Sequence, residues 1–380
     1  MPGEITASVV IIPTWIRQRI QKSCFSGYGH RVDSQFDSDF GPYSSLYFPL
    51  IRNWNTRLTS GQRAAWSTTI GALSAGMSCL FMKHLSSKSV AETLGFGIST
   101  RSLAELSDYF RDQKKLYVLP SEIPQDLRGF CYVCQSMQKF SILEQPDGVN
   151  WRETLCCPSC NLINRWRSSM HVFEALCTPA RNCRLYLTEA VTPLYQVVKQ
   201  RYKYTLGSEY VAERKSGEWA EASGSKILVQ DVTALSFENN EFDVLMSFDV
   251  LEHVPDYQAA IREFSRVLKP GGWLIVSAPF AFAEKTMLRA SIRPDGSIEH
   301  HLPPDYHGDP FSNNGILCFQ NFGMDLLSLL DEAGIKSASV LGFTDLDLGY
   351  LGENILFVGQ KKSCRSESWD KIKRWLGFKD

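Results

Sequence analysis

Short apolar runs alternate with segments of helical periodicity from Asn182 onward. An apolar run of five to eight residues between polar turns is typical of a buried strand. The runs predict strands over 183–187, 204–210, 226–231, 242–248 and 273–280. A helix is predicted over 193–202, and a later helix over 324–333 precedes strands over 337–343 and 354–359. Alternating strands and helices indicate an α/β fold with a mostly parallel sheet.

The segment after the fourth predicted strand carries apolar residues at helical spacing, so one face of a helix is expected to pack on the sheet. These residues are Tyr257, Ala260, Ile261, Phe264, Val267 and Leu268. The sequence Lys-Pro-Gly-Gly at 269–272 is predicted to end this helix before the fifth strand begins.

The hydrophobic pattern divides the chain into four parts. Residues 1–126 are rich in serine, arginine and aromatic residues and receive no function; a helix is predicted over 62–85, and 119–126 reads as a linker. Three further parts are expected: a small ribbon over 127–167, the α/β domain over 168–362 and a C-terminal tail over 363–380.

Composition excludes several classes of protein. Forty basic and 41 acidic residues give a net charge of −1, so no overall field would attract nucleic acid or anionic membrane. The apolar runs near the N-terminus and over 68–82 are too short for a signal peptide or a membrane span. Eleven cysteines without a disulfide-like spacing suit a reducing compartment. A cytoplasmic protein without a membrane span is expected.

Two Cys-x-x-Cys pairs provide the clearest sign of a metal. They comprise Cys131 with Cys134 and, 22 residues later, Cys157 with Cys160. Two such knuckles supply four thiolates in the tetrahedral arrangement that zinc prefers, and four protein ligands leave no position for water. The sequence predicts a structural zinc ribbon, although Cys156 leaves the register of the second knuckle open.

The stretch from Asp231 to Val254 contains FDVLMSFDVLEHV, and RVLKPGGWLIV follows at 266–276. This combination resembles the class I S-adenosylmethionine-dependent methyltransferases of the type 11 group, over about 180 residues. The resemblance implies a Rossmann-like domain with a seven-stranded, mostly parallel sheet and S-adenosylmethionine as the cofactor.

Acidic residues stand at the ends of the first four predicted strands: Glu189, Glu209, Asp231 and Asp249. Ligands of open α/β sheets bind beyond the carboxyl ends of the strands, so these acids are expected to line one site, unless they are only solvated loop residues. By resemblance, Glu189 lies near the methionine moiety, Glu209 binds the ribose and Asp231 the adenine. Cofactor contacts are also expected from Val232, Ser247 and Phe248.

The first loop departs from the family pattern. It reads Thr-Glu-Ala-Val-Thr-Pro over 188–193, without the glycines that let the backbone pass close to the cofactor. The loop therefore takes a different path, or cofactor binding is weak or lost.

Two further segments carry candidate chemistry. In resembling ubiquinone-type O-methyltransferases the LEHV segment contains acids and a histidine, so Asp249, Glu252 and His253 could hold a divalent metal; alternatively, Glu252 and His253 only cap and pack the next turn. The segment 299–309 contains three of the seven histidines. His300 and His307 are candidate bases or acceptor-binding residues, or they only fasten the loop by hydrogen bonds.

The leading hypothesis is a methyltransferase acting on a small-molecule or glycan-type acceptor. One alternative is a zinc-ribbon RNA methyltransferase, with Arg165, Arg167 and Arg181 forming a local basic patch. Another is a binding protein that keeps the fold without catalysis.

Overall fold

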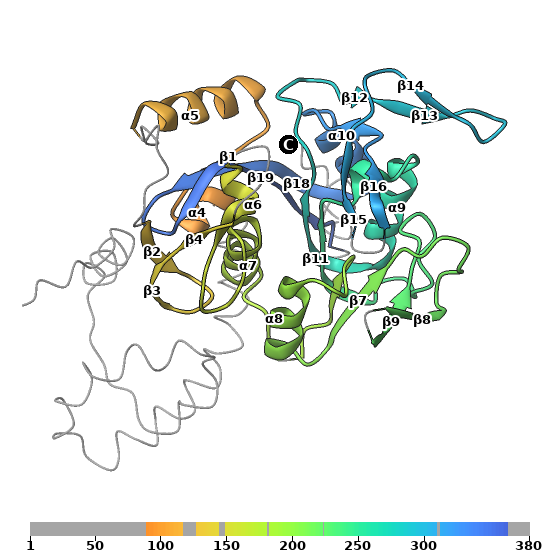
Figure 1. Ribbon diagram of the computed structural model, residues 1–380, viewed down its shortest axis with the longest axis horizontal. Helices are drawn as coiled ribbons and strands as arrows, with labels where there is room; N and C mark the ends of the chain where they lie inside the picture. Colours follow the sequence, from red (N-terminus) through yellow and green to blue (C-terminus); the bar gives the residue numbers. More distant parts are fainter. Residues whose placement is uncertain are drawn as a thin grey trace, which may run out of the picture. The chain divides into compact units, whose positions relative to one another are not determined.

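The computed structural model describes residues 89–116, 127–143, 149–180, 182–222, 224–309 and 312–363. Within them, a nine-stranded sheet has the order β1-β18-β19-β11-β10-β6-β7-β9-β8 (Figure 1). The predicted helix over 62–85, the predicted linker and nearly all of the predicted tail lie outside the described residues. No helix in the described ranges is long and apolar enough to cross a membrane.

Five neighbouring strands run parallel at the centre of the sheet, and β18 and β19 run antiparallel to each other beside them. The parallel strands are β6 (Leu185–Leu187), β7 (Thr205–Glu209), β9 (Ser225–Val229), β10 (Phe242–Phe248) and β11 (Leu268–Ser277). The last two long strands are β18 (Ile335–Asp345) and β19 (Tyr350–Lys361). The predicted Rossmann-like α/β fold is confirmed.

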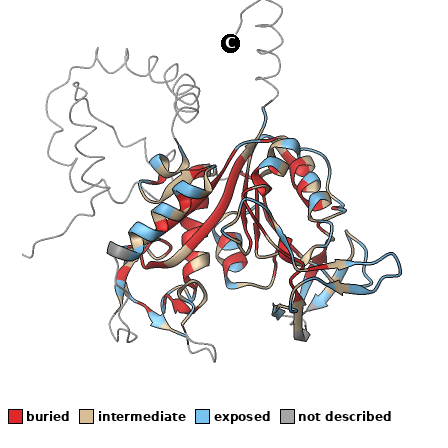
Figure 2. Ribbon diagram, turned by 90° about the horizontal axis from the view of Figure 1, so that it is seen from above, coloured by how far each residue is buried: buried red, intermediate tan, exposed pale blue. Residues whose placement is uncertain are grey.

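Helices cover both faces of the sheet, because successive strand residues point to opposite sides. Leu185 and Leu187 pack with helices α7 (Asn164–Cys177) and α8 (Pro193–Arg201), whereas Tyr186 belongs to the opposite core. That core contains α5 (Leu103–Leu116), α9 (Tyr257–Val267) and α10 (Leu326–Glu332). Figure 2 accordingly shows strands that are buried along most of their length, between helices with one buried side and one exposed side.

The predicted helix and strand segments agree with the structure to within a few residues, with one larger difference. Strand β11 begins at Leu268, so the Lys-Pro-Gly-Gly segment belongs to the strand rather than to a separate turn. Gly271 has φ +81°, and a Cβ on Gly272 would lie 3.0 Å from the carbonyl oxygen of Asp243. The two glycines therefore allow the irregular first residues of β11 to pass close to β10.

Part of the N-terminal region belongs to the sheet, which corrects the predicted boundary at residue 126. Strand β1 (Ile98–Thr100) pairs with β18 at the edge of the sheet, and α5 packs against β18. The preceding short helix α4 (Val90–Leu94) begins at a capping box formed by Ser89 and Glu92. At the opposite edge, β8 (Trp219–Ala222) pairs with β9 and was not predicted.

The cysteine-rich segment consists of β2 (Arg128–Cys131), β3 (Ser136–Lys139), β4 (Ser141–Ile142), α6 (Trp151–Thr154) and β5 (Leu155–Cys156). Its buried residues Val133, Phe140 and Leu155 belong to the same hydrophobic core as Leu185 and Val244 of the central strands. The predicted ribbon is therefore fused to the α/β domain through a shared core.

An insertion after β11 forms small antiparallel pairs beside the 3-10 helix η3 (Leu251–His253). The pairs are β12 (Met287–Leu288) with β17 (Gln320–Asn321), β13 (Ala290–Ile292) with β14 (Ile298–His300), and β15 (Tyr306–Asp309) with β16 (Ser312–Leu317). Gln320 ties the insertion to η3, since its side-chain amide donates to the carbonyl oxygens of Leu251 and Val254.

Candidate functional site

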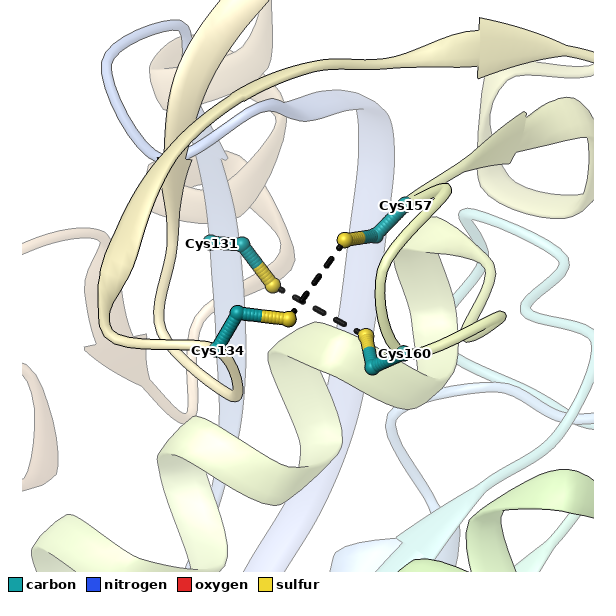
Figure 3. Close-up of side chains that lie close together, drawn as sticks. All are labelled: Cys131, Cys134, Cys157 and Cys160. Atoms are coloured by element: carbon teal, nitrogen blue, oxygen red, sulfur yellow. Dashed lines mark hydrogen bonds between the residues drawn. The ribbon is translucent and has the colours of Figure 1, made fainter.

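The four cysteines of the two knuckles converge on one point (Figure 3). The Sγ atoms of Cys131 and Cys160 are 3.9 Å apart, and those of Cys134 and Cys157 are 3.7 Å apart. Sulfur ligands about 2.3 Å from a tetrahedral zinc would be separated by about 3.8 Å. The arrangement therefore has the dimensions of a zinc site with four thiolates.

Both knuckles have the same backbone turn. The residue after the second cysteine has positive φ in each, 53° at Gln135 and 56° at Asn161. Cys156 is not a member of the group, because its Sγ is directed to the carbonyl oxygen of Cys157. The register that the sequence left open is thus Cys157 with Cys160.

The basic patch of the RNA hypothesis is wrong for the two arginines that the structure describes. Arg167 is fully buried and donates to the carbonyl oxygens of Leu348 and Gly349, with its guanidinium 4.1 Å from the ring centroid of Phe140. Arg165 forms ion pairs with Glu153 and Asp249. Both arginines hold the cysteine-rich segment on the domain, and Arg181 lies outside the described residues.

The carboxyl ends of the parallel strands bring several predicted site residues to one edge. Glu189 follows β6, is 7% exposed, and has an Oε1 atom without a hydrogen-bond partner among the described residues. Burial raises the pKa of Glu189 to about 7, against the opposing effect of the Arg165 guanidinium. A buried carboxylate oxygen of this kind has the capacity to accept from a ligand.

Glu209 at the end of β7 organises the glycine-free loop. Its Oε1 accepts hydrogen bonds from the backbone N–H groups of Ala190 at 2.6 Å and Val191 at 3.0 Å. A glycine is still required where the loop crosses the neighbouring strand, because a Cβ on Gly207 would lie 2.5 Å from the carbonyl oxygen of Glu189. The close approach thus depends on a glycine of β7 instead of glycines in the loop.

The remaining predicted cofactor residues lie at the ends of β9 and β10. Asp231 Oδ1 accepts from the backbone N–H and the hydroxyl of Thr233, which fixes the loop after β9. Val232 and Phe248 are buried, and Ser247 is fully buried with its hydroxyl accepting from Thr188. The structure brings these residues to the same edge as Glu189, and their cofactor contacts stay predictions.

Asp249 forms ion pairs with two arginines that the sequence pattern does not connect with it. Arg152 on α6 lies 2.6 Å from Asp249 Oδ1, and Arg165 on α7 lies 3.1 Å from Oδ2. Burial would raise the pKa of Asp249, but the two guanidinium groups hold it well below its usual range. The cysteine-rich segment thus supplies a wall of the strand-end site, and 97 residues of sequence separate Arg152 from its partner.

The two predicted histidines have different surroundings. His300 is exposed on β14, where it pairs with Ala290. His307 on β15 is half-buried, and its Nδ1 lies 3.6 Å from Glu252 Oε1. Among the described residues, His307 therefore lies against Glu252 of the LEHV segment, whereas His300 is on the exposed hairpin.

Comparisons with known proteins agree with the location of this edge. Residues 189–276 match the family model described as a methyltransferase domain. A 2-methyl-6-phytyl-1,4-hydroquinone methyltransferase from Synechocystis sp. is 38% identical over 74 residues, covering 17% of this chain and 23% of the relative. A demethylmenaquinone methyltransferase from Staphylococcus aureus is 32% identical over 100 residues, covering 26% of this chain and 39% of the relative.

The chain therefore spans about a quarter to two fifths of the length of these curated relatives. Among solved structures, a 1,6-didemethyltoxoflavin-N1-methyltransferase from Burkholderia thailandensis aligns with a TM-score of 0.36 and 13% identity, covering 52% of this chain and 79% of the other.

Proposed function

We propose that this chain transfers a methyl group from S-adenosylmethionine to a small-molecule acceptor. The match of residues 189–276 to the family model of a methyltransferase domain supports the proposal. The observation that carries the proposal is Glu189, a buried carboxylate with an unpartnered oxygen at the end of β6, inside the matched segment. Such an oxygen is costly unless a ligand donates to it.

The residues at the strand ends fit this cofactor. Glu189 would accept from the amino group of its methionine moiety, and Glu209 and Asp231 would accept from the ribose hydroxyls and the adenine amine. Each carboxylate has two oxygens, so the bonds that Glu209 and Asp231 make within their loops are compatible with these roles. When bound, the cofactor supplies an electrophilic methyl group on a sulfonium.

Val232, Ser247 and Phe248 would complete the cofactor site, with the Phe248 ring favouring positive charge nearby. Asp249 would act differently from the sequence expectation. Its ion pairs with Arg152 and Arg165 would fix the wall of the site, rather than bind the cofactor directly.

The acceptor is proposed to be a small molecule that reacts through a hydroxyl, or another nucleophile, placed beside the insertion. The names of both curated relatives refer to quinone-type acceptors, which supports a phenol or quinol; a sugar hydroxyl is the second class to test. We propose that His307, rather than the exposed His300, acts at the acceptor.

The cysteine cluster is proposed to hold a structural zinc ion. The support is the tetrahedral spacing of its sulfur atoms and the equal turns of the two knuckles.

Methyl transfer can be tested directly with S-adenosylmethionine labelled in the methyl group. The purified full chain is incubated with quinols, phenols, glycans and RNA, and labelled products are separated by class. Incorporation into a quinol, phenol or glycan that is lost in Glu189→Gln supports the proposal. Incorporation only into RNA, or equal incorporation by the variant, contradicts it.

A further inference from the structure

Three side chains that the proposed cofactor site does not use converge between η3 and the insertion. They are Glu252 and His253 of η3 and His307 of β15. Glu252 Oε1 lies 3.7 Å from His253 Nε2 and 3.6 Å from His307 Nδ1. The imidazole rings are nearly perpendicular, with centroids 5.0 Å apart. Residues 54 positions apart therefore present three ligand-type atoms to one small volume.

Of these three groups, Glu252 is the one whose burial is least favourable. Its side chain is 0% exposed, and neither carboxylate oxygen has a hydrogen-bond partner among the described residues. A buried carboxylate without hydrogen bonds is strongly unfavourable, so buried charges in proteins are paired or coordinate metals. A positively charged group in direct contact with the carboxylate oxygens of Glu252 would stabilise its charge.

The separations of 3.6 and 3.7 Å are too long for hydrogen bonds between these atoms. They are close to the distance between two ligands of one cation, since nitrogen and oxygen ligands about 2.1 Å from a tetrahedral ion lie about 3.4 Å apart. The geometry therefore favours an ion between the three side chains over direct contacts among them.

The outer contacts of both histidines orient them as ligands. His253 Nδ1 donates to the carbonyl oxygen of Leu317 at 2.9 Å, because a carbonyl can only accept, and the neutral ring then has a bare Nε2 facing Glu252. On the far side of the His307 ring, Asp305 Oδ2 lies 4.0 Å from Nε2 and favours a proton there, which leaves Nδ1 as the ligand atom. The hydrogen bond from His253 to Leu317 is an outer contact typical of metal-binding histidines, whereas Asp305 acts on His307 only through its charge.

We propose that Glu252, His253 and His307 bind a divalent first-row transition ion, with Zn²⁺ as the representative. Imidazole suits zinc and its neighbours better than magnesium, and two histidines with one carboxylate leave a coordination position open. This set differs from the Asp249-containing set that the sequence suggested, because both oxygens of Asp249 are taken by arginines. An oxygen of the acceptor could occupy the open position, and this part of the proposal rests on the proposed function. The binding of the ion does not depend on it.

Metal content measured per chain separates this site from the cysteine cluster. The full chain, its single and double variants and a control are equilibrated with ZnCl₂, desalted and analysed by elemental mass spectrometry. We expect two ions per wild-type chain, one in Glu252→Gln or His307→Ala, and one in Cys131→Ser/Cys134→Ser. His301→Ala, an exposed histidine of the same insertion that contacts Ser291, should keep two.

Calorimetric titration with ZnCl₂ provides a second measurement that does not depend on any acceptor. Asp305→Asn should weaken binding of the second ion by less than about tenfold, because Asp305 is not hydrogen-bonded to His307 and acts through its charge alone. Because His307 is partly exposed, its variant is expected to fold even if Glu252→Gln does not. One ion per wild-type chain, or two in folded His307→Ala, would overturn the proposal. A chain that binds two ions but no S-adenosylmethionine would overturn the proposed function alone.

Discussion

Four acids at the carboxyl ends of neighbouring strands have different surroundings. Glu189 is buried with an unpartnered oxygen, Glu209 holds two loop amides, Asp231 holds its own turn, and Asp249 is paired with two arginines. Their positions followed from the strand pattern, since carboxyl ends of parallel strands share an edge. The partners of Asp249 did not, because Arg152 on α6 and Arg165 on α7 precede the predicted α/β domain.

Glu189→Gln tests the burial of this carboxylate. The pKa of Glu189 is raised from 4.5 to about 7, so the folded chain keeps its proton to higher pH than the unfolded chain does. Stability is therefore lost as the pH rises from about 4.5 through 7, by on the order of 3 kcal/mol. The free energy of unfolding is measured in urea without cofactor for the variant and for wild type. The variant should be more stable relative to wild type at pH 8 than it is at pH 5. An equal difference at both values would contradict the assignment.

Asp249→Asn tests the ion pairs that fasten the cysteine-rich segment to β10. Asparagine also tolerates the positive φ of 53° at this position, so the backbone is kept. Loss of the charge leaves Arg152 and Arg165 with Glu153 as their remaining ion-pair partner and should destabilise the chain by about 1 to 3 kcal/mol. The exposed pair Arg293 and Glu299 is the matched control, and Glu299→Gln should leave the stability nearly unchanged. Equal effects of the two substitutions would refute the fastening role.

At the scale of the element, the loop after β6 shows how a local pattern can be replaced by a contact between strands. The path of this loop could not be predicted from its own residues, which include no glycine. The close approach of the loop to the sheet is made possible by Gly207 on β7, and the carboxylate of Glu209 binds the loop backbone. Strand β10 was predicted over its full length from its apolar run. The short edge strands β1 and β8 were not, since neither carries such a run.

Gly207→Ala tests the close approach. An added Cβ would lie 2.5 Å from the carbonyl oxygen of Glu189, so β7 and the loop must move apart. We expect a loss of about 1 to 3 kcal/mol in thermal or urea unfolding. The control is Gly308→Ala, where nothing lies within 4 Å of the added atom. A loss no larger than that of the control would mean that the loop does not depend on this glycine.

Across the whole molecule, the four-cysteine cluster and the strand-end edge are joined by one core. Cys131 and Phe140 share that core with Leu185, and Arg152 reaches Asp249 from α6 between the two knuckles. The sequence predicted both modules, but it could not show that they share side chains, because that contact depends on tertiary packing.

Loss of the proposed zinc should therefore affect both modules. Cys131→Ser/Cys134→Ser is expected to destabilise the chain by roughly 3 kcal/mol or more and to weaken cofactor binding as well. Cys177→Ser changes a cysteine outside the cluster and should cost about 1 kcal/mol or less. Thermal unfolding with and without a chelator measures the first effect. Unchanged cofactor affinity in the folded double variant would show that the strand-end site does not depend on the cysteine cluster.

We expect the strand-end edge to bind S-adenosylmethionine despite its glycine-free loop. Isothermal titration of the full chain with S-adenosylmethionine and S-adenosylhomocysteine measures this most directly. The expected result is one cofactor per chain, with affinity reduced about tenfold or more in Glu189→Gln and in Asp231→Ala, since each loses a hydrogen bond to the ligand. Absence of binding at roughly millimolar cofactor, or wild-type affinity in both variants, would contradict it.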